Sequence, residues 1–250
     1  MTAAADFRPV VLVPVYNHER AIGAMVDAIL AHPVPCLLID DGSSASCAAV
    51  LRDLAARADG RVTLIRLPRN QGKGAAVMAG FDAAWQAGYT HALQIDADGQ
   101  HDADCIPAFF DLARRHPEAI VCGTPLYDAS VPRGRLIGRY VTHVWVWVHT
   151  LSFAIRDSMC GLRVYPLAAV VPLTRTTRIG PRMEFDTEVL VHLVWRGISV
   201  LNIATPVTYP SDGVSHFRMW RDNVRISWMH TRLFFGMLGR LPMLLARKLA

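Results

Sequence analysis

Two carboxylates separated by one residue follow an apolar run near the middle of the chain. Asp96 and Asp98 come directly after the run at 91–95, and Gln100 follows them. Carboxylates at this spacing can hold a hard divalent cation, which in turn can bridge to the oxygens of a diphosphate. The alternative is an ordinary turn at Asp98 and Gly99. Because the pair follows a buried run, we favour the metal site.

Polar residues also follow the first two apolar runs. The run at 10–15 leads into the polar residues at 16–19, and the run at 36–39 leads into Asp40 and Asp41. Two adjacent acids at a strand end are costly to bury unless they meet hydrogen-bond donors. The base or ribose of a nucleotide supplies such donors. The alternative is helix capping, for which the nearby Asn and Ser residues are suitable.

A glycine-rich stretch with one lysine follows the third apolar run, at 62–67. Its residues are Asn70, Gln71, Gly72, Lys73 and Gly74. It is not a Walker A loop, which needs Gly at position 67 and Ser or Thr at position 74. It is not a dinucleotide-binding fingerprint either, because Val77 stands at the third glycine position. A glycine-rich helix entry still suits a diphosphate, and the chain has only two lysines. The alternative is a helix entry with a solvated lysine.

These residues need a scaffold that brings several strand ends together. Apolar runs at 10–15, 36–39, 62–67, 91–95 and 120–122 alternate with expected helices at 19–31, 44–57, 74–87 and 104–115. The alternation predicts βαβ units and a mostly parallel sheet. In such sheets, ligands bind at the carboxyl ends of the strands. The polar residues described above all stand at those ends.

The segment 125–157 breaks this alternation. It contains proline, glycine and the aromatic run at 144–148, and it predicts an insertion that covers or extends the site. An apolar stretch at 160–165, a helix near 184–196 and a strand near 199–207 are expected after it.

Together these motifs resemble family 2 glycosyltransferases of the GT-A fold, and most of all the dolichol-phosphate mannose synthase branch. The matching segments are 14–19, 40–43, 70–74, 96–100, Asp157 with 160–165, and 184–188. The resemblance runs from about residue 9 to about residue 216. It implies an α/β fold with a mostly parallel central sheet flanked by helices. It also implies a nucleotide diphosphate sugar as donor, linked to UDP or GDP.

The resemblance assigns one set of residues to the donor. These are Pro14, Tyr16, Glu19 and Asp41, which would line the nucleoside pocket, and Asp96; the strand-end positions add Asp40 and Lys73 as donor-binding candidates. Asp96 and Asp98, with Gln100 nearby, would hold Mg²⁺ or Mn²⁺ on the donor diphosphate. That metal would stabilise charge on the leaving nucleoside diphosphate. His216 is a candidate for a further metal ligand, although a lone histidine is more often structural.

A second set of residues would act on the acceptor. Asp186 falls where many family members carry the general base of an inverting displacement, and Glu188 is a second candidate catalytic carboxylate. An acceptor phosphate would need no base. Arg133, Arg135 and Arg139 lie where the mannose synthase branch places arginines that bind this phosphate. As alternatives, the carboxylates could cap the following helix and the arginines could form a solvated basic loop.

The composition excludes several classes of protein. Apolar residues make up 52% of the 250 residues and charged residues 19%, which excludes a disordered chain. Five cysteines without C-x-x-C spacing indicate neither a disulfide framework nor a zinc site. No secretory signal pattern is evident, so a cytoplasmic location is expected.

Residues 1–211 hold 19 basic and 19 acidic residues, so the net charge of +5 comes from residues 212–250. This distribution argues against nucleic acid as a partner and favours an anionic partner or membrane surface.

We expect residues 1–211 to form the transferase domain and residues 212–250 a basic helical tail. Residues 216–241 lack proline and predict one helix. At 100° per residue, one face of about 100° collects Arg218, Arg221, Arg225, Arg232 and Arg240. Such a helix could lie at a membrane interface with its arginines at lipid phosphates. Its charges and glycines make it a poor membrane span. The alternative is packing on the domain or on a second copy of the chain.

The sequence therefore predicts a metal-dependent, inverting glycosyltransferase, peripheral at the inner face of the cytoplasmic membrane. It would transfer a sugar to a lipid-linked acceptor, with polyprenyl phosphate as a candidate. In one alternative, a hydroxyl of another lipid or small molecule accepts the sugar and Asp186 is the base. In another, the chain is a non-catalytic regulator that binds nucleotide sugars. The acids at positions 96, 98 and 186 argue against that last alternative.

Overall fold

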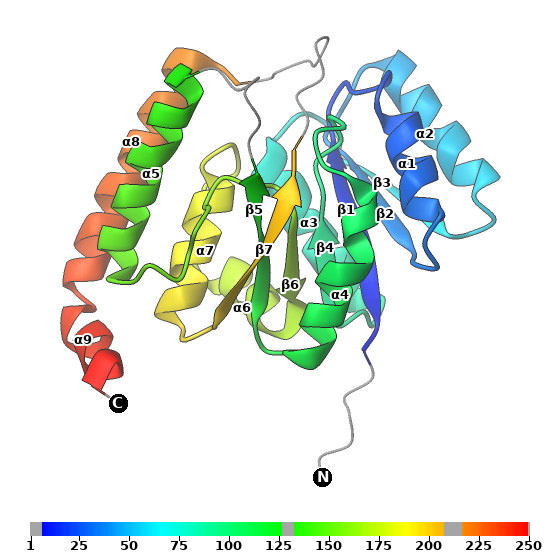
Figure 1. Cartoon of the computed structure of the whole chain (residues 1–250). Coiled ribbons are helices and arrows are strands. Elements are labelled where there is room, and N and C mark those ends of the chain that lie inside the picture. Colours follow the sequence, from blue (N-terminus) through cyan, green and yellow to red (C-terminus); the bar gives the residue numbers. More distant parts are fainter. Residues whose placement is uncertain (1–6, 127–132, 208–216, 250) are drawn as a thin grey trace.

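The computed structural model describes residues 7–126, 133–207 and 217–249, and in them one seven-stranded sheet forms the centre of the molecule. The strands are β1 (Pro9–Val15), β2 (Cys36–Asp40), β3 (Val62–Arg66), β4 (His91–Gln94), β5 (Ile120–Leu126), β6 (Arg163–Pro166) and β7 (Val200–Pro206). They lie in the order β3-β2-β1-β4-β6-β5-β7 (Figure 1). The sheet is parallel apart from β6, which runs antiparallel to both β4 and β5. The expected α/β architecture with a mostly parallel sheet is confirmed.

Helices cover both faces of this sheet. One face is covered by α1 (Ile22–Leu30), α2 (Ala45–Arg57) and α4 (Ile106–Arg115). The other is covered by α3 (Lys73–Gln86), α6 (Leu167–Thr176) and α7 (Phe185–Trp195). A further pair, α5 (Arg133–Thr150) and α8 (Met219–Leu238), lies side by side next to α7, and α9 (Leu241–Leu249) follows α8 (Figure 1).

The burial of β1 explains why its sequence shows no polar alternation. Val10 and Leu12 point into the core beneath α3 and α6, whereas Val11 and Val13 point into the core beneath α1 and α4. All four side chains are fully buried. Because successive strand residues face opposite sides of a sheet, a strand covered on both sides must be apolar throughout.

The segment that breaks the alternation contains α5. Residues 127–132 of this segment lie outside the described part of the chain, and α5 occupies most of the remainder. The helix is anchored through buried Val146 and through Trp147, whose Nε1 donates to the carbonyl oxygen of Ile155 at 2.9 Å. The aromatic run therefore supplies both buried and exposed positions of one helix.

The tail forms two helices, α8 and α9, where one was expected. Met229, Leu233 and Met237 of α8 are buried in the core next to α7, and Leu244 of α9 joins them. Packing on the body, which was the alternative at the sequence level, is therefore what the described residues show. No helix in residues 7–126, 133–207 and 217–249 is long and apolar enough to cross a membrane.

Part of the expected arginine face of the tail points toward the body. Arg232 Nη2 lies 3.1 Å from Glu188 Oε1 of α7, and the Arg240 guanidinium lies 4.6 Å from the ring centre of Trp195. Arg247 of α9 donates to the carbonyl oxygen of Trp195 at 3.0 Å, at the end of α7. These arginines hold the tail against α7. Helical periodicity alone could not distinguish this role from lipid binding.

Two glycines offer a matched test of how tightly the helices pack on the sheet. A Cβ at Gly80 of α3 would collide with the Leu12 side chain of β1, whereas a Cβ at Gly23 of α1 would meet nothing within 4 Å. We expect Gly80→Ala to lower the free energy of unfolding by about 1–3 kcal/mol through overpacking. Gly23→Ala should raise it by about 0.5–1 kcal/mol, because alanine restricts the unfolded chain. Urea unfolding of both variants measures the difference, and equal effects would contradict the close contact.

Candidate active site

The second strand end and the glycine-rich loop are joined through one carboxylate. Asp41 accepts hydrogen bonds from the backbone N–H groups of Gln71 (2.7 Å) and Gly72 (2.8 Å) and from Asn70 Nδ2 (2.9 Å). Gly72 has φ +108°, and a Cβ there would collide with Pro181, so this turn requires glycine. Burial raises the pKa of Asp41. Asp41 therefore shapes the loop from which α3 begins.

The adjacent carboxylate, Asp40, points away from this loop. It is fully buried, accepts from the Ser43 N–H at 2.8 Å and lies 2.6 Å from Arg66 Nη1. These contacts close the turn after β2. The structure thus separates two neighbouring acids that the sequence treated as a pair. The prediction that Asp40 binds the donor gains no support from its contacts.

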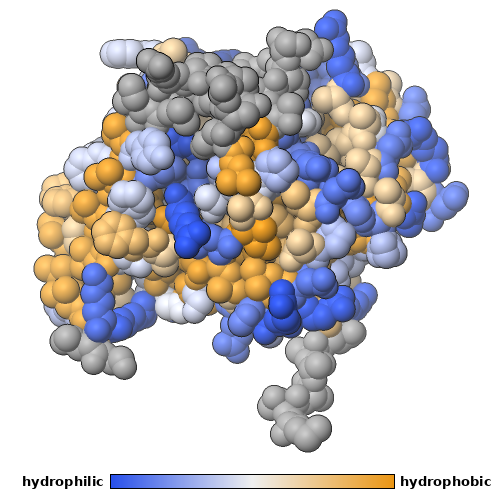
Figure 2. All heavy atoms as spheres, viewed as in Figure 1, coloured by the Kyte–Doolittle hydropathy of each residue, from blue (hydrophilic) through white to orange (hydrophobic). Residues whose placement is uncertain are grey.

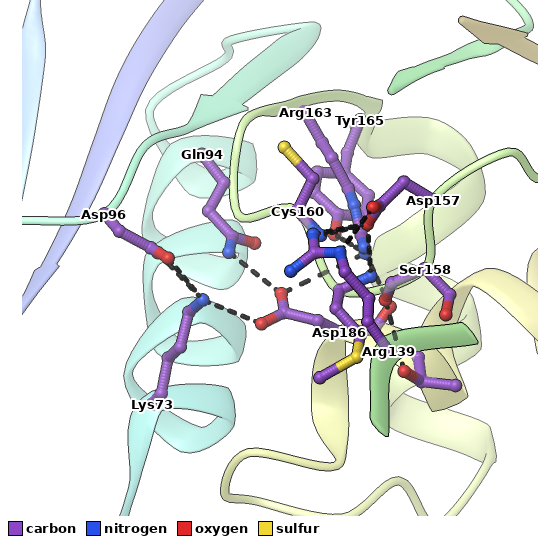
Figure 3. Close-up of polar contacts among 12 residues, drawn as sticks. Lys73, Gln94, Asp96, Arg139, Asp157, Ser158, Cys160, Arg163, Tyr165 and Asp186 are labelled. Atoms are coloured by element: carbon purple, nitrogen blue, oxygen red, sulfur yellow. Dashed lines mark hydrogen bonds and ion pairs between the residues drawn. The ribbon is translucent and has the colours of Figure 1, made fainter. Parts of the chain in front are cut away.

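Lys73, the first residue of α3, lies between two carboxylates (Figure 3). Its Nζ is 2.8 Å from Asp96 Oδ2 and 2.7 Å from Asp186 Oδ2. Only 16% of the Lys73 side chain is exposed. Burial lowers the pKa of the Lys73 ammonium, but the two carboxylates outweigh burial and raise it. Likewise, burial raises the pKa of Asp96, and the Lys73 ammonium outweighs that effect and lowers it. The predicted metal ligand and the predicted base therefore share one cation.

Asp186 is held on several sides, by groups from α3, β4 and β6. Gln94 Nε2 donates to its Oδ1 at 3.0 Å, while Lys73 binds Oδ2. Arg163, which is fully buried, donates from Nη1 to the Asp186 backbone carbonyl oxygen and, at 3.3 Å, to Tyr165 Oη (Figure 3). Arg163 therefore holds the backbone of the first turn of α7, and the Asp186 carboxylate is oriented toward Lys73.

The carboxylates after β4 suit a metal that also binds a diphosphate. Asp98 Oδ1 accepts from the Gln100 N–H at 3.0 Å, and burial, followed by the nearby Asp96 carboxylate, raises the pKa of Asp98. In the described residues, no group of three or more His, Cys, Asp or Glu side chains is arranged to hold a metal ion. Mg²⁺ commonly takes one or two carboxylates, with substrate phosphates and water completing its shell. Asp96 and Asp98 fit that mode. His216 lies outside the described residues.

Arg139 of α5 is engaged by a buried carboxylate. Its Nε and Nη2 donate to the two oxygens of Asp157 at 2.6 and 2.7 Å, and His143 Nε2 lies 3.4 Å from the same group. Asp157 also accepts from the N–H groups of Met159 and Cys160. This pairing attaches α5 to the loop before β6. Part of the Arg139 charge is thereby balanced, and its predicted role toward an acceptor phosphate stays a prediction.

The other two predicted phosphate-binding residues cannot be assessed in the same way. Arg133 and Arg135 belong to the first turn of α5, but their side chains lie outside the described part of the structure. Their predicted role also stays a prediction.

Glu188 is not brought to the Lys73 cluster. Its Oε2 accepts from the Gly180 N–H at 2.7 Å, and its Oε1 meets Arg232 of α8. Residues two apart on a helix point to different sides, so Asp186 faces Lys73 while Glu188 faces the tail. The contacts of Glu188 support a structural role, and its predicted catalytic role gains no support from them.

The predicted donor residues at the end of β1 are placed near the strand ends. Pro14 is buried within β1, Tyr16 is half-buried just after it, and Glu19 is exposed. Asn17 connects this segment to the next one, because its Oδ1 accepts from the Ser44 N–H at 2.8 Å. The two polar segments after β1 and β2 are therefore adjacent, as the strand-end argument predicted.

Sequence reasoning assigned no role to three residues that hold the site together, Gln94, Arg163 and Asp157, although Asp157 and Arg163 stood within segments that match the family. Gln94 and Arg163 stood inside segments interpreted as apolar strands. A polar or charged residue within a strand buried on both faces is costly unless it has a specific partner. That signal was present in the sequence, but it does not name the partner.

The family model of glycosyl transferase family 2 matches this chain over residues 10–151. Two similar curated proteins have names that contain a polyprenol monophosphate sugar or a dolichyl phosphate. The polyprenol monophosphomannose synthase of Mycolicibacterium smegmatis is 26% identical, and the match covers 94% of this chain and 89% of that protein. The dolichyl-phosphate beta-glucosyltransferase of Dictyostelium discoideum is also 26% identical, with 88% and 74% covered.

A solved structure shares the fold. Glucosyl-3-phosphoglycerate synthase from Mycobacterium tuberculosis, determined with Mn²⁺ and UDP-glucose, aligns with a TM-score of 0.63 at 15% identity. The alignment covers 94% of this chain and 79% of that one. At such low identity the likeness bears on the fold alone, and the fold is that of the GT-A glycosyltransferases.

The Asp157 contacts predict a pH-dependent contribution to stability. Although burial raises the pKa of Asp157, His143 and Arg139 outweigh burial and hold it well below its usual range. A carboxyl with a lowered pKa in the folded state stabilises the fold above its unfolded pKa of about 4, and this contribution is lost as the pH falls. We expect Asp157→Asn to cost about 3 kcal/mol at pH 7, and less at pH 3.

Urea unfolding of the wild type and Asp157→Asn at both pH values measures this contribution. The control is Asp27→Asn, which removes an exposed ion pair with Arg57 and should change stability by less than about 1 kcal/mol. A difference between wild type and Asp157→Asn that stays constant from pH 7 to pH 3 would contradict the ionic role of Asp157.

Proposed function

The chain belongs to glycosyl transferase family 2, and on that premise we propose that it transfers a sugar from a nucleotide diphosphate sugar to a lipid-linked phosphate such as polyprenyl phosphate. The observation that carries the proposal is the arrangement of Asp96, Asp186 and Lys73 at the carboxyl edge of the sheet. The names of the similar curated proteins support the acceptor class.

On the donor side, the chain would supply groups for a nucleoside and for a diphosphate. The loop held by Asp41 leads directly into the N-terminus of α3, where backbone N–H groups and the helix dipole favour phosphate. Lys73 adds a positive charge at that position. Asp96 and Asp98 would hold Mg²⁺ or Mn²⁺, which supplies Lewis-acid stabilisation of the leaving nucleoside diphosphate.

The contacts of Asp186 favour a phosphate over a hydroxyl as acceptor. Each of its carboxylate oxygens already accepts a hydrogen bond, one from Gln94 and one from Lys73. A substrate hydroxyl would have to share those oxygens before its proton could be removed. A phosphate is already an anion and can attack the anomeric carbon directly, which gives inversion. The alternative is transfer to a hydroxyl with Asp186 as the base. It is supported by the position of the Asp186 carboxylate, which shares Lys73 with the predicted metal ligand Asp96.

The outer side of α5 and α8 supports a peripheral contact with a membrane. We call this surface the α5–α8 apolar face, and it consists of the exposed residues Tyr140, Val141, Val144, Trp145, Trp220, Val224, Trp228, Phe235 and Leu238. Figure 2 shows apolar side chains gathered over this part of the molecule. The five α8 residues fall within about 80° of one another on the helix. Exposed patches of this kind mark interaction sites, and tryptophan is favoured at membrane interfaces.

The position of this face changes how the tail would bind lipid. The sequence predicted arginines at lipid phosphates, yet two of them, Arg232 and Arg240, contact α7, as does Arg247 of α9. In our proposal, apolar side chains of α5 and α8 enter the interface, while the remaining basic residues lie near anionic headgroups at the inner face of the cytoplasmic membrane. The acceptor would then reach the active site from the membrane along α5.

Substitution of Asp186 distinguishes the two acceptor classes. Polyprenyl phosphate and polyprenol share a lipid chain and differ only in the phosphate. We expect Asp186→Asn to lower transfer to polyprenyl phosphate less than about tenfold, because no base is needed. Any transfer to polyprenol should fall about 10²- to 10⁴-fold. The measurement is the initial rate of sugar transfer from UDP- and GDP-linked sugars in the presence of Mn²⁺.

The same assay tests the proposed function as a whole. Asp98→Asn should abolish transfer, because it removes a predicted metal ligand. If the wild type neither transfers a sugar to either lipid nor binds UDP or GDP in the presence of Mn²⁺, the proposed function is wrong.

Charge placed in the α5–α8 apolar face tests the membrane contact. We expect the double variant Trp220→Glu/Trp228→Glu to bind phosphatidylglycerol vesicles about tenfold less than the wild type, because both side chains are exposed on this face. Trp85→Glu is the control, since Trp85 is an exposed tryptophan of α3 outside the face. Vesicle sedimentation measures the bound fraction. Unchanged binding, or a dimer that the double variant dissociates, would contradict membrane docking.

A further inference from the structure

In the structure, the ammonium of Lys73 forms an ion pair with Asp96, the predicted metal ligand. Its Nζ lies 2.8 Å from each oxygen of the Asp96 carboxylate, within ion-pair distance of both. The same ammonium is 2.7 Å from Asp186. The contact is therefore short and shared with a second acid. A cation that binds Asp96 has to replace this ammonium or share the carboxylate with it.

The backbone of Lys73 is fixed, but its side chain is not committed to one partner. Asp41 holds the turn at 70–72, and the N–H group of Ala75 donates to the Pro181 carbonyl oxygen at 2.9 Å. The first turn of α3 cannot shift without breaking these bonds. A lysine side chain is a flexible stem that carries three donors, so the ammonium can change partners while the helix stays in place.

The described part of the chain offers few carboxylates for a metal alone. Asp96 and Asp98 are the pair after β4, and in the described residues they belong to no group of three or more metal-binding side chains. The backbone at Gly161 packs directly against the Asp96 carboxylate, because a Cβ there would collide with it. A divalent cation at two carboxylates, one of them neutralised by an ammonium, is held weakly. A diphosphate changes this balance, because it brings oxygen ligands for the metal and negative charge for the lysine.

We propose that Lys73 is an internal counter-cation of Asp96, and that metal and donor diphosphate bind together because the metal takes Asp96 while the Lys73 ammonium moves to the diphosphate. This inference rests on the proposed function, because it assumes a nucleoside diphosphate at the edge of the sheet. Asp186 keeps the ammonium close throughout the exchange, which makes Asp186 a positioning residue for Lys73. In this exchange the Lys73 ammonium gives up Asp96 for the diphosphate and keeps Asp186, whereas the metal gains Asp96 and shares the diphosphate with Lys73.

The proposal predicts opposite changes in two affinities when the charge of Lys73 is removed. Without the competing ammonium, Lys73→Met should bind Mn²⁺ alone about tenfold more tightly than the wild type. Without the cation for the diphosphate, the same variant should bind UDP or GDP about tenfold more weakly at saturating Mn²⁺. Lys73→Arg keeps the charge and should leave Mn²⁺ binding as weak as in the wild type.

The experiment measures free Mn²⁺ by electron paramagnetic resonance, and nucleotide binding by calorimetry, on the full chain. Lys73→Gln replaces Lys73→Met if the latter does not fold in a thermal melt. Arg175→Gln is the matched control, because it removes an exposed cation of α6 that pairs with Asp82 of α3, the helix that begins at Lys73. This control should change neither affinity.

Each outcome separates the inference from the proposed function. Tighter Mn²⁺ binding together with weaker nucleotide binding supports the exchange. If Lys73→Met and Lys73→Gln bind Mn²⁺ no more tightly than the wild type, Lys73 does not compete for Asp96 and the inference is wrong. If Mn²⁺ binding tightens but nucleotide binding is unchanged, the move of the ammonium to the diphosphate is wrong. If the wild type binds neither nucleotide with Mn²⁺, the proposed function itself fails.

Discussion

The ammonium of Lys73 lies between carboxylates that come from distant parts of the chain, and the surrounding elements are arranged so that it can reach both. Asp96 follows β4, and Asp186 belongs to the first turn of α7. Two carboxylates so close would repel each other without a cation between them. Lys73 reaches both because α3 begins at a tight turn that Asp41 holds against the end of β2. Loss of Lys73 would leave both carboxylates without this cation.

The reversed direction of β6 completes this arrangement. Because β6 runs antiparallel to β4, Arg163 at its start pairs with Gln94 at the end of β4. In a parallel strand, the first residue would lie at the opposite edge of the sheet, away from the site. A fully buried guanidinium is costly, and here it binds the backbone of Asp186 and the hydroxyl of Tyr165. The one reversed strand thus supplies support for the first turn of α7.

Helix α7 connects the site to the tail. Asp186 on one side of it meets Lys73, and Glu188 on another side meets Arg232 of α8. Arg240 and Arg247 bind at the end of the same helix. Much of the excess positive charge of the tail is therefore used to attach the tail to the body. The surface that α5 and α8 leave exposed is largely apolar, which relates the proposed membrane contact to both helices.

The sequence by itself determined the strands of the sheet, the helices between them and the clustering of polar residues at one edge. It could do so because burial on both faces makes a strand apolar throughout, and because parallel strands end at a common edge. Only the tertiary structure decided that Asp41, and not Asp40, holds the loop, and that Asp186, and not Glu188, meets Lys73. It also decided which side of α8 is covered. These choices depend on contacts between segments far apart in the chain, and no local pattern of residues records which distant group a side chain will meet.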